Sequence, residues 1–202
     1  MTSDFDLLDA WRAGDPQKGD ELFHRYFDSI YRFFSRKVHG EVEDLIQKTF
    51  LACVEGRDKF RKEASFRTYL FSIARNQLYR HWRTRKKDEA LDFTVSSLHD
   101  LGPTPSAEAA KHEEQRLLLD ALRHIPLDLQ IAVELHYWEG MSGPELATVL
   151  DIPEGTVRSR LRRAREALEK KLEELAGTTD KLRATLDNFD KWARSLKDLV
   201  SS

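Results

Sequence analysis

Residues 152–168 read IPEGTVRSRLRRAREAL, and this stretch decides the fold of the C-terminal half of the chain. Its apolar residues recur at spacings of four, three and four, which places them on one side of an α-helix. They are Val157, Leu161, Ala164 and Leu168. Between positions 154 and 166 the stretch holds five arginines and no acidic residue. The pattern predicts a helix that turns one side to a core and presents positive charge elsewhere.

A second, shorter helix is predicted directly before it, at residues 143–150. Ser142 and Glu145 have the S-x-x-E spacing of a capping box, which marks a helix start. Asp151 then makes the turn, so the two helices form a predicted helix-turn-helix, whose second helix enters the major groove of DNA. The alternative is a packed helical hairpin with a solvated basic face. We favour DNA binding, because clustered cations without neighbouring acids repel one another unless an anion binds them.

Charge is unevenly distributed along the chain of 202 residues, although the formal net charge is only −2 at pH 7. Residues 4–21 are predominantly acidic. Residues 66–87 contain seven basic side chains and no acidic one. These are Arg67, Arg75, Arg80, Arg83, Arg85, Lys86 and Lys87. A basic block of this kind indicates nucleic-acid binding more directly than the overall charge does.

Several classes of protein are excluded by what the sequence lacks. No run of apolar residues is long enough to cross a bilayer, and the first twenty residues lack the basic and apolar regions of a signal peptide. Cys53 is the only cysteine, which excludes a disulfide framework and a zinc site built from cysteines. We therefore expect a cytoplasmic protein that inserts into no membrane and uses no cofactor or metal.

The N-terminal half is predicted to contain helices at residues 21–38, 42–54 and 66–87. The first carries a dense aromatic stripe, which we interpret as core. This stripe includes Phe23, Phe27 and Tyr31. Residues 56–64 break the helical periodicity and form a predicted loop with Phe60 at its centre. Ser65 is the expected N-cap of the third helix.

The third of these helices leaves a basic surface that also carries aromatic and amide side chains. The surface consists of Arg75, Asn76, Tyr79, Arg80, Trp82 and Arg83. Such a set suits single-stranded DNA, because unpaired bases stack on rings while cations hold the phosphates. The alternative is that Tyr79 and Trp82 belong to the core. We expect this of one of them but not of the whole set.

A linker and a tail complete the predicted organisation. Residues 88–112 lose the helical periodicity, become acidic and contain Gly102 and two prolines, which indicates a linker. The tail has apolar residues at heptad spacing: Leu182, Leu186, Phe189, Ala193, Leu196 and Val200. We therefore predict an all-α fold of two small helical domains, 1–87 and 113–176, joined by the flexible acidic linker 88–112. The second domain is the helix-turn-helix domain, and 177–202 form a C-terminal amphipathic helix that packs on the chain itself or on a partner.

Three stretches between residues 21 and 172 together resemble extracytoplasmic-function (ECF) sigma factors, small bacterial proteins that direct RNA polymerase to promoters. EVEDLIQKTFLACVEGRDKF at 41–60 resembles the family's D-L-x-Q-E-T-F segment. SFRTYLFSIARNQLYRHWRTRKK at 65–87 resembles its F-R-x-W-L-x-x-I-A-R-N segment, and GMSGPELATVLDIPEGTVRSRLRRAREAL at 140–168 resembles its helix-turn-helix. The departures are Lys48 in place of Glu, Tyr69 in place of Trp and Asp151 in place of Gly. Lys48 reverses a charge at the expected polymerase contact.

The resemblance implies three binding surfaces, in domains that correspond to sigma regions 2 and 4. A surface for the clamp helices of core RNA polymerase would consist of Asp44, Leu45, Gln47, Lys48, Thr49 and Phe50. The melted −10 promoter element would be held by Phe60, Arg61, Lys62, Arg75, Asn76, Tyr79, Arg80 and Arg83, with a flipped base captured at the loop. The −35 element would be bound by Thr156, Arg158, Ser159, Arg162 and Arg163. The implied partners are bacterial core RNA polymerase, promoter DNA and, as for many family members, an anti-sigma factor.

Two other functions compete with this interpretation. A dimeric repressor or activator would explain the helix-turn-helix and could dimerise through the C-terminal heptads, but it leaves residues 44–50 and 66–87 unexplained. An enzyme such as a nuclease is disfavoured, because the sequence holds no P-loop, no H-E-x-x-H motif and no carboxylates with metal-ligand spacing. We therefore expect no catalytic residues.

Overall fold

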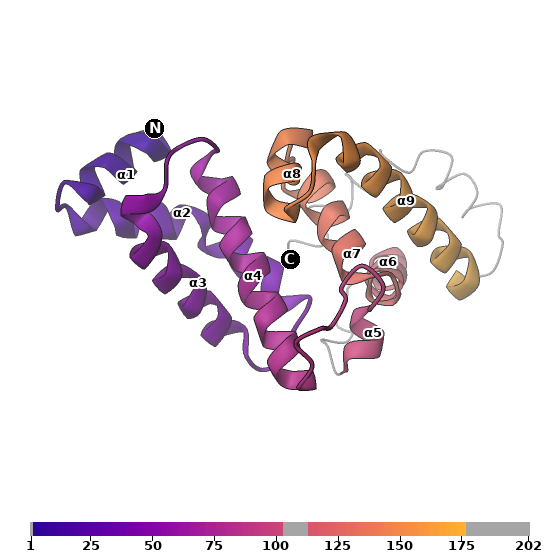
Figure 1. The fold of residues 1–202 in the computed structure, drawn as a ribbon. Coiled ribbons are helices and arrows are strands. Elements are labelled where there is room, and N and C mark those ends of the chain that lie inside the picture. The colour runs from indigo at the N-terminus through magenta and orange to yellow at the C-terminus, as the bar shows by residue number, and fades with distance from the viewer. Residues whose placement is uncertain (1, 103–112, 177–202) are drawn as a thin grey trace.

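The structure is a computed structural model that describes residues 2–102 and 113–176, and these residues form helices and no β-strand (Figure 1). In chain order the elements are α1 (Asp4–Arg12), α2 (Pro16–Ser35), α3 (Val42–Gly56), the 3-10 turn η1 (Arg57–Lys59), α4 (Phe66–Lys86), α5 (Leu98–Leu101), α6 (Glu113–His124), α7 (Leu127–Val133), the π-helical turn η3 (Glu134–Trp138), α8 (Gly143–Leu150) and α9 (Glu154–Ala176). The predicted all-α class is therefore confirmed.

Helices α1 to α4 form the first bundle, on the left of Figure 1. Capping side chains mark three of its helix starts, because each accepts a hydrogen bond from a backbone N–H of the first turn. They are Ser3 before α1, Asp15 before α2 and Ser65 before α4. Leu22, Phe34 and Leu70 are fully buried between these helices. The three predicted helices of this half are present, and α1 is an additional one.

The aromatic stripe of α2 only partly belongs to the core. Phe33 and Phe34 are buried, but Phe27 and Tyr31 are 46% and 43% exposed. Their rings lie 6.5 Å apart along the outer face of the helix. The interpretation of the whole stripe as core was therefore wrong, because a helix can bury only one side in a bundle of this size.

The second bundle contains the predicted helix-turn-helix. Helix α8 has the predicted bounds, and the capping box of Ser142 and Glu145 is present. Asp151 makes the turn to α9 in a left-handed conformation, with φ of 54°. Such a conformation is tolerated by aspartate better than by most residues. Before α8, the chain forms α7 followed by the π-helical turn η3.

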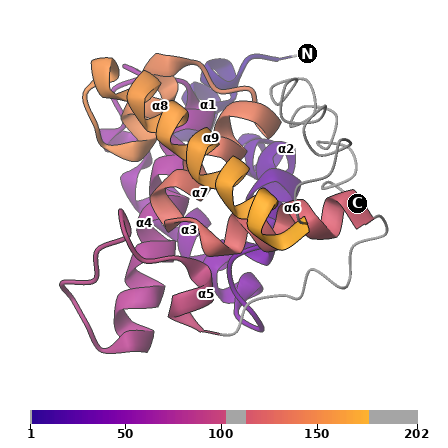
Figure 2. The ribbon, with the colours of Figure 1, turned by 90° about the vertical axis from the view of Figure 1, so that its right-hand side faces the viewer.

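The two bundles pack against each other through α4, which lies between them (Figure 1). Figure 2 shows the molecule from the side of the second bundle, with α9 in front. One hydrophobic cluster contains Phe71 and Leu78 of α4 together with Ile131 of α7 and Leu146 of α8. A separate cluster joins α6 to α9. The predicted domains therefore share a buried apolar contact in this arrangement.

The first part of the predicted linker is more ordered than expected. Phe93, Leu98 and Leu101 are buried, and the Leu127 N–H donates to the carbonyl oxygen of Ser96 at 3.0 Å. Residues 88–102 therefore do not behave as a flexible connection, because their apolar side chains fill space beside α4 and α6. Residues 103–112 and the predicted amphipathic helix at 177–202 lie outside the described part of the chain.

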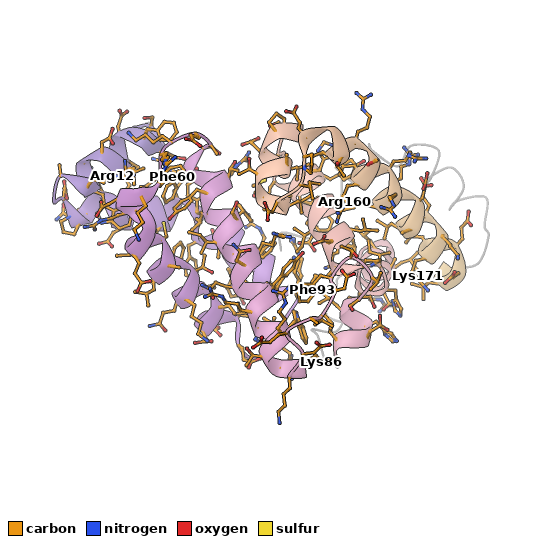
Figure 3. The ribbon with its side chains drawn as sticks, viewed as in Figure 1. Arg12, Phe60, Lys86, Phe93, Arg160 and Lys171 are labelled. Atoms are coloured by element: carbon orange, nitrogen blue, oxygen red, sulfur yellow. The ribbon has the colours of Figure 1, made fainter. Side chains whose placement is uncertain are left out.

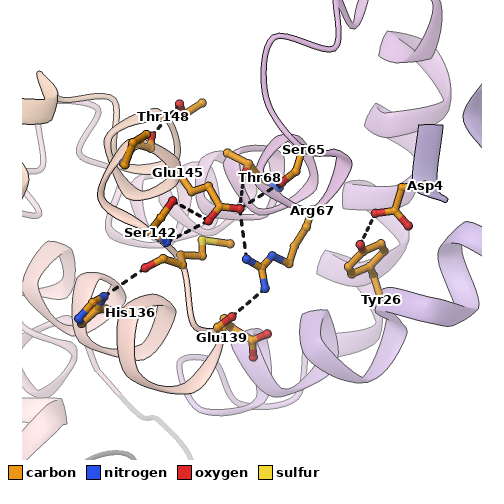
Figure 4. Close-up of polar contacts among 12 residues, drawn as sticks. Asp4, Tyr26, Ser65, Arg67, Thr68, His136, Glu139, Ser142, Glu145 and Thr148 are labelled. Carbon is orange, nitrogen blue, oxygen red and sulfur yellow. Dashed lines mark hydrogen bonds and ion pairs between the residues drawn. The ribbon is translucent and has the colours of Figure 1, made fainter. Parts of the chain in front are cut away.

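Glu145 caps α8 and also ties it to the first bundle (Figure 4). Its Oε2 accepts hydrogen bonds from the Ser142 backbone N–H at 2.9 Å and from the Ser142 hydroxyl at 2.8 Å. Its Oε1 faces α4, where Arg67 Nη2 lies 3.2 Å away and the Thr68 hydroxyl donates at 3.3 Å. Arg67 Nη1 also donates to the carbonyl oxygen of Glu139 at 2.7 Å. Four partners thus make Glu145 a bridge between the bundles.

Acid should weaken this bridge as the pH falls from 4.5 to 2. Burial alone would raise the pKa of Glu145, but hydrogen bonds from Ser142 and the Arg67 guanidinium outweigh it and lower the pKa from 4.5 to about 2. A carboxylate with a lowered folded-state pKa contributes stability above its unfolded pKa and loses it as the pH falls through the folded pKa. Denaturation midpoints between pH 2 and 5 should therefore vary less with pH in Glu145→Gln than in the wild type. An unchanged pH dependence in this variant would contradict the assignment.

Candidate nucleic-acid interface

Helix α9 has the two unlike faces that its sequence predicts. Val157, Ala164 and Leu168 are buried. The predicted −35 residues lie on the other sides: Arg158, Ser159, Arg162 and Arg163 are exposed and Thr156 is half-buried. An exposed helix of this kind after a tight turn can place arginines against phosphates and base edges.

Arg160 differs from its neighbours, because it turns inward to a buried carboxylate (Figure 3). Its Nη1 lies 2.5 Å from Oδ2 of Asp128, which is 4% exposed in the first turn of α7. The Tyr79 hydroxyl donates to the other oxygen of Asp128, and Arg75 Nη2 lies 3.9 Å from that oxygen. Asp128 therefore contacts one arginine of its own bundle and two side chains of α4 in the first bundle.

One side of α4 is occupied by this contact. Tyr79 is 7% exposed and stacks on Phe93, with ring centroids 4.0 Å apart. The Arg75 guanidinium lies 4.5 Å from the Tyr79 ring, and that of Arg83 lies 5.3 Å from the Phe93 ring. Burial lowers the pKa of Arg75 from its usual 12.5, although Asp128 opposes the shift. Of these predicted −10 residues, Tyr79 and Arg75 thus face Asp128 of the second bundle, and Arg83 lies against Phe93 of residues 88–102.

The rings of Tyr79 and Trp82 are both buried, because Tyr79 is 7% exposed and Trp82 is fully buried. The expectation that only one of Tyr79 and Trp82 belongs to the core is therefore wrong for this arrangement. The causes differ between the two: Trp82 is fully enclosed, whereas Tyr79 is held against Asp128 and Phe93, which lie outside the first bundle.

An open cleft of about 530 Å³ contains Phe60, Arg61 and Asn76 of the predicted −10 set and also reaches Arg75. On the first bundle it is lined by residues that include Phe60, Arg61, Tyr69, Arg75 and Asn76. Thr148, Val149 and Asp151 of the second bundle form the opposite wall. Phe60 stacks on Tyr69, with ring centroids 4.4 Å apart and planes 17° apart. Flat aromatic pairs beside cations suit the stacking of unpaired bases.

The structure divides the remaining predicted −10 residues between other places. Arg80 is exposed in a groove between α3 and α4, beside Asp44 and Lys48, and not in the cleft. Lys62 is tied to Asp9 of α1, with its Nζ 2.5 and 2.6 Å from the two carboxylate oxygens. Only part of the set therefore converges on one site.

Tyr69 and Ser72 line the cleft, and sequence reasoning did not select either as a site residue. A signal was present, because positions 69, 72 and 76 share one helix face with the predicted Asn76. The end of α3 approaches Tyr69 so closely that a Cβ at Gly56 would overlap the tyrosine hydroxyl. The position of this ring could not be predicted from α4 alone.

Only part of the predicted polymerase surface on α3 is exposed. Asp44, Gln47 and Lys48 are exposed, and Lys48 Nζ lies 2.6 Å from Asp44 Oδ2. Leu45 and Thr49 are 2% and 0% exposed, and the Thr49 hydroxyl donates to the Leu45 carbonyl oxygen. Both residues face the core, so neither can contact a partner in this packing.

Two other α3 residues complete the description of this face. Phe50 is half-buried, with its ring centroid 4.5 Å from that of Phe23. Leu51 is 55% exposed and was not predicted. It follows Asp44, Gln47 and Lys48 at the i, i+3, i+4, i+7 spacing of one helix face, and this spacing was the available signal.

The described ranges, 2–102 and 113–176, hold no group of three or more His, Cys, Asp or Glu side chains that could bind a metal ion. In the same ranges, every helix falls short of the length and apolar character needed to cross a bilayer. Cys53 is buried, and burial raises the pKa of its thiol to about 12.

Two family models match separate parts of the chain. The model of sigma-70 region 2 matches residues 22–88, and that of sigma-70 region 4 matches residues 115–168. Among solved structures, CnrH in complex with the cytosolic domain of CnrY has a TM-score of 0.63 at 23% identity, over 88% of this chain and 100% of that chain. The sigma factor RpoE of Bartonella quintana, in complex with the anti-sigma factor NepR, has a TM-score of 0.55 at 23% identity, over 76% of this chain and 97% of that chain. These two likenesses concern the fold.

Relatives of similar length match most of the chain. The ECF RNA polymerase sigma-E factor of Haemophilus influenzae is 31% identical over 180 residues, which are 84% of this chain and 95% of the relative. The RNA polymerase sigma-H factor of Pseudomonas aeruginosa is 32% identical over 183 residues, which are 85% and 95% of the two chains. With a helix-turn-helix, a cleft beside α4 and these matches, the chain belongs to the ECF group of the sigma-70 family of RNA polymerase sigma factors.

Proposed function

We propose that this protein binds core RNA polymerase, recognises the −35 and −10 promoter elements, melts the −10 DNA and so initiates transcription. The observation that carries the proposal is the presence, in one chain, of a basic helix-turn-helix in the second bundle and of stacked rings beside Asn76 and Arg61 on the first bundle. A protein that binds only duplex DNA needs the first feature and not the second. The protein supplies no catalytic group of its own and acts in the cytoplasm.

The −35 element is assigned to α9. Arg158 and Arg162 are exposed one turn apart, and Ser159 lies between them. An arginine that donates two hydrogen bonds to a guanine edge contributes about 1–3 kcal/mol of discrimination, whereas contacts to phosphates position the helix without selecting a sequence. Arg163 and Thr156 are proposed to serve mainly in positioning.

The −10 element is assigned to the first-bundle wall of the cleft, which α4 and the loop before it form and which stays in place when the bundles separate. Extruding a base costs a few kcal/mol of lost stacking and pairing, so a cleft that accepts it favours melting of the sequence it fits. The stacked Phe60 and Tyr69 rings offer a flat surface, while Asn76 offers hydrogen bonds to a base edge and Arg61 a charge for a phosphate. We assign residues 1–87 to region 2 and 113–176 to region 4.

Promoter binding requires the two bundles to separate. The −35 and −10 elements are about 25 base pairs apart, or about 85 Å of B-form DNA at about 3.4 Å per base pair. A compact chain of this length has a radius of gyration of only about 17 Å. It cannot reach both elements while α4 packs on α8. The contacts of Arg75 and Tyr79 with Asp128 therefore belong to the free protein and must break on the promoter.

Core polymerase is proposed to bind the exposed face of α3. This face, which we call the α3 face, consists of Asp44, Gln47, Lys48 and Leu51. An exposed apolar side chain next to polar ones is a common composition of a protein interface. An anti-sigma factor is a further proposed partner, since the two solved structures compared above are complexes of such sigma factors with their binding partners.

Run-off transcription tests the proposal. Purified protein, core polymerase and DNA from upstream of the protein's own gene should yield a discrete transcript. Arg158→Ala should reduce its rate about 10- to 100-fold by loss of −35 discrimination, the kinetic equivalent of about 1–3 kcal/mol. Asn76→Ala should reduce it by loss of melting, and Glu173→Ala, an exposed acid at the end of α9, should leave it unchanged.

If no transcript forms, two further measurements test whether the proposal is wrong. A protein that binds free promoter duplex tightly but does not co-elute with core polymerase would contradict the proposal and favour a stand-alone regulator. A protein that co-elutes with polymerase but transcribes nothing from this DNA should transcribe from promoters selected out of a random library, and a failure there would contradict the proposal as well.

A further inference from the structure

Helix α1 holds the loop that precedes α4, although α1 lies outside the residues that match the region 2 model. The loop, here called the 57–62 loop, consists of the turn η1 followed by Phe60, Arg61 and Lys62. Figure 3 shows Arg12 of α1 directly beside Phe60. Phe60 and Arg61 line the cleft that we assign to the −10 element, so the shape of this loop bears on base recognition.

The guanidinium of Arg12 binds the backbone at both ends of the turn η1. Arg12 Nε donates to the carbonyl oxygen of Arg57 at 3.0 Å, and Nη2 donates to the same oxygen. Nη2 also donates to the carbonyl oxygen of Phe60 at 2.6 Å. Hydrogen bonds from a charged donor are about twice as strong as neutral ones, and the planar fork fixes the separation of its two acceptors. The Phe60 backbone is thereby held in one position relative to α1.

A second set of contacts with α1 holds Lys62, at the other end of the loop. Lys62 has a left-handed backbone conformation with φ of 59°, which costs a residue with a Cβ roughly 1 kcal/mol. Its ammonium group is held by both oxygens of Asp9, at 2.5 and 2.6 Å, and lies 5.4 Å from the Phe5 ring. The Arg57 guanidinium in turn lies 5.1 Å from the Trp11 ring of α1. These α1 contacts offset the backbone strain and select one loop conformation.

Ordering a loop before its ligand arrives improves recognition. Fixing the backbone of one residue costs about 1–2 kcal/mol, and a loop that is already fixed does not incur this cost when the base enters. A fixed loop also rejects wrong bases, because it cannot adapt to them. Since the 57–62 loop makes its anchoring contacts to α1 through the Arg57 and Phe60 carbonyl oxygens and the Lys62 side chain, its order depends on α1.

We propose that Arg12 and Asp9 of α1 are positioning residues for −10 recognition: they hold the 57–62 loop in its base-accepting form and thereby set the selectivity for the captured base. The inference rests on the proposed function of the cleft. It adds a role for α1, which touches the loop and does not line the cleft itself.

The test measures selectivity and not only activity. Full-length protein with core polymerase would be assayed on promoters that carry each of the four bases at each −10 position. Selectivity is the transcription rate with the preferred base divided by the rate with another base at the same position. Arg12→Ala should lower this ratio about tenfold at one −10 position, and it should leave the corresponding ratio for substitutions in the −35 element unchanged. Arg12→Lys should recover part of the ratio, because an ammonium group can reach a carbonyl oxygen but lacks the fixed fork.

A matched control separates positioning from loss of stability. Arg25 also ties α1 to the bundle, with Nη1 2.5 Å from Asp4 Oδ1, but it does not touch the 57–62 loop. Arg25→Ala should lower the melting temperature without changing base selectivity. If Arg12→Ala fails to fold, Asp9→Asn serves instead, since this exposed side chain anchors only Lys62 in the loop, and it should lower selectivity about twofold.

Two results of the selectivity assay would overturn the proposal. One is an equal loss of rate by Arg12→Ala on every promoter with unchanged selectivity, and the other is unchanged selectivity in Asp9→Asn. Amide hydrogen exchange gives a readout that needs no polymerase: exchange at 57–62 should accelerate in Arg12→Ala, and an unchanged rate there would also contradict the proposal. A third result is that the wild type fails to initiate transcription with polymerase while exchange at 57–62 still accelerates in Arg12→Ala. That result would contradict the proposed function, but it would support the conclusion that Arg12 holds the 57–62 loop.

Discussion

Replacing Asp128 with alanine should open the free protein and raise its affinity for single-stranded −10 DNA about tenfold or more. Asp128 is 4% exposed and holds Arg160 and Tyr79, with Arg75 at 3.9 Å. Truncating one member of a buried charge pair costs about 2–5 kcal/mol, and about 1.4 kcal/mol is a factor of ten. In the closed form the two bundles are packed together, and in the open form they are apart. Losing the contact of Asp128 with α4 destabilises only the closed form, so the equilibrium shifts toward the open form.

Anisotropy with a labelled −10 oligonucleotide measures the affinity, and small-angle scattering measures the opening as an increase in the radius of gyration. Asp128→Asn tests the same point more gently, because an amide oxygen can still accept the Arg160 bond. Glu173→Ala is the charge-matched control, since Glu173 is an exposed acid in the same bundle. Folded Asp128 variants with wild-type affinity and wild-type dimensions would show that this contact does not hold the bundles together.

Replacing Glu134 with alanine should destabilise the packed form of the two bundles by about 3–5 kcal/mol, because Lys37 of the first bundle keeps a buried charge without its partner in the second bundle. Lys37 is 0% exposed, and its Nζ lies 2.5 Å from Glu134 Oε2 and donates to the Phe33 carbonyl oxygen at 2.8 Å. Burial lowers the pKa of Lys37 from 10.5 to about 8, and Glu134 is the main group that opposes this shift. Urea denaturation at pH 7 measures the change.

Two comparisons make this prediction specific. The double variant Lys37→Met with Glu134→Leu should recover only part of the lost stability, because apolar residues can replace the ion pair but leave buried Gln130, which donates to Glu134 at 2.9 Å, without this acceptor. Glu21→Ala removes a partner from the exposed Lys18–Glu21 pair, whose atoms lie 3.1 Å apart, and should cost under about 1 kcal/mol. Equal costs for Glu134→Ala and Glu21→Ala would contradict the account of Lys37 as a buried charge.

The helices of the chain were largely predictable, because local signals determine where they begin. Ser65 and the Ser142–Glu145 box lie where the sequence places them, and both precede helices with apolar residues at helical spacing. Helix α1 was missed, because its apolar Leu7, Leu8 and Trp11 are interspersed with acids that dominated the interpretation of this region. The cap at Ser3 was the available signal.

The candidate site was predictable only where exposure follows from a single helix. The exposed arginines of α9 were identified correctly, since every buried position of that helix is apolar. Arg160 was not assigned to the −35 set, and its contact with Asp128, which lies far away in the sequence, was not predicted. Leu45 and Thr49 were assigned to a surface through a family segment that mixes inward and outward residues.

Contacts between the two bundles could not be predicted at all from periodicity. Tyr79 has the same helical setting whether or not the second bundle covers it, and its burial comes from Phe93 and Asp128. The cleft has the same origin, since Asp151 and Val149 form one wall while Asn76 lies on the other. Such sites depend on long-range packing, which one helix pattern does not encode.

Permanganate reactivity of thymines in the −10 element tests the central claim most directly, because it reports melted DNA. With core polymerase and this protein together, these thymines should become reactive on a promoter that the protein uses, and neither component alone should produce this. Asn76→Ala should abolish the reactivity while leaving the complex with polymerase intact. Unreactive thymines in a complex that contains both proteins, or reactivity with polymerase alone, would contradict the account of this chain as the factor that recognises and melts the −10 element.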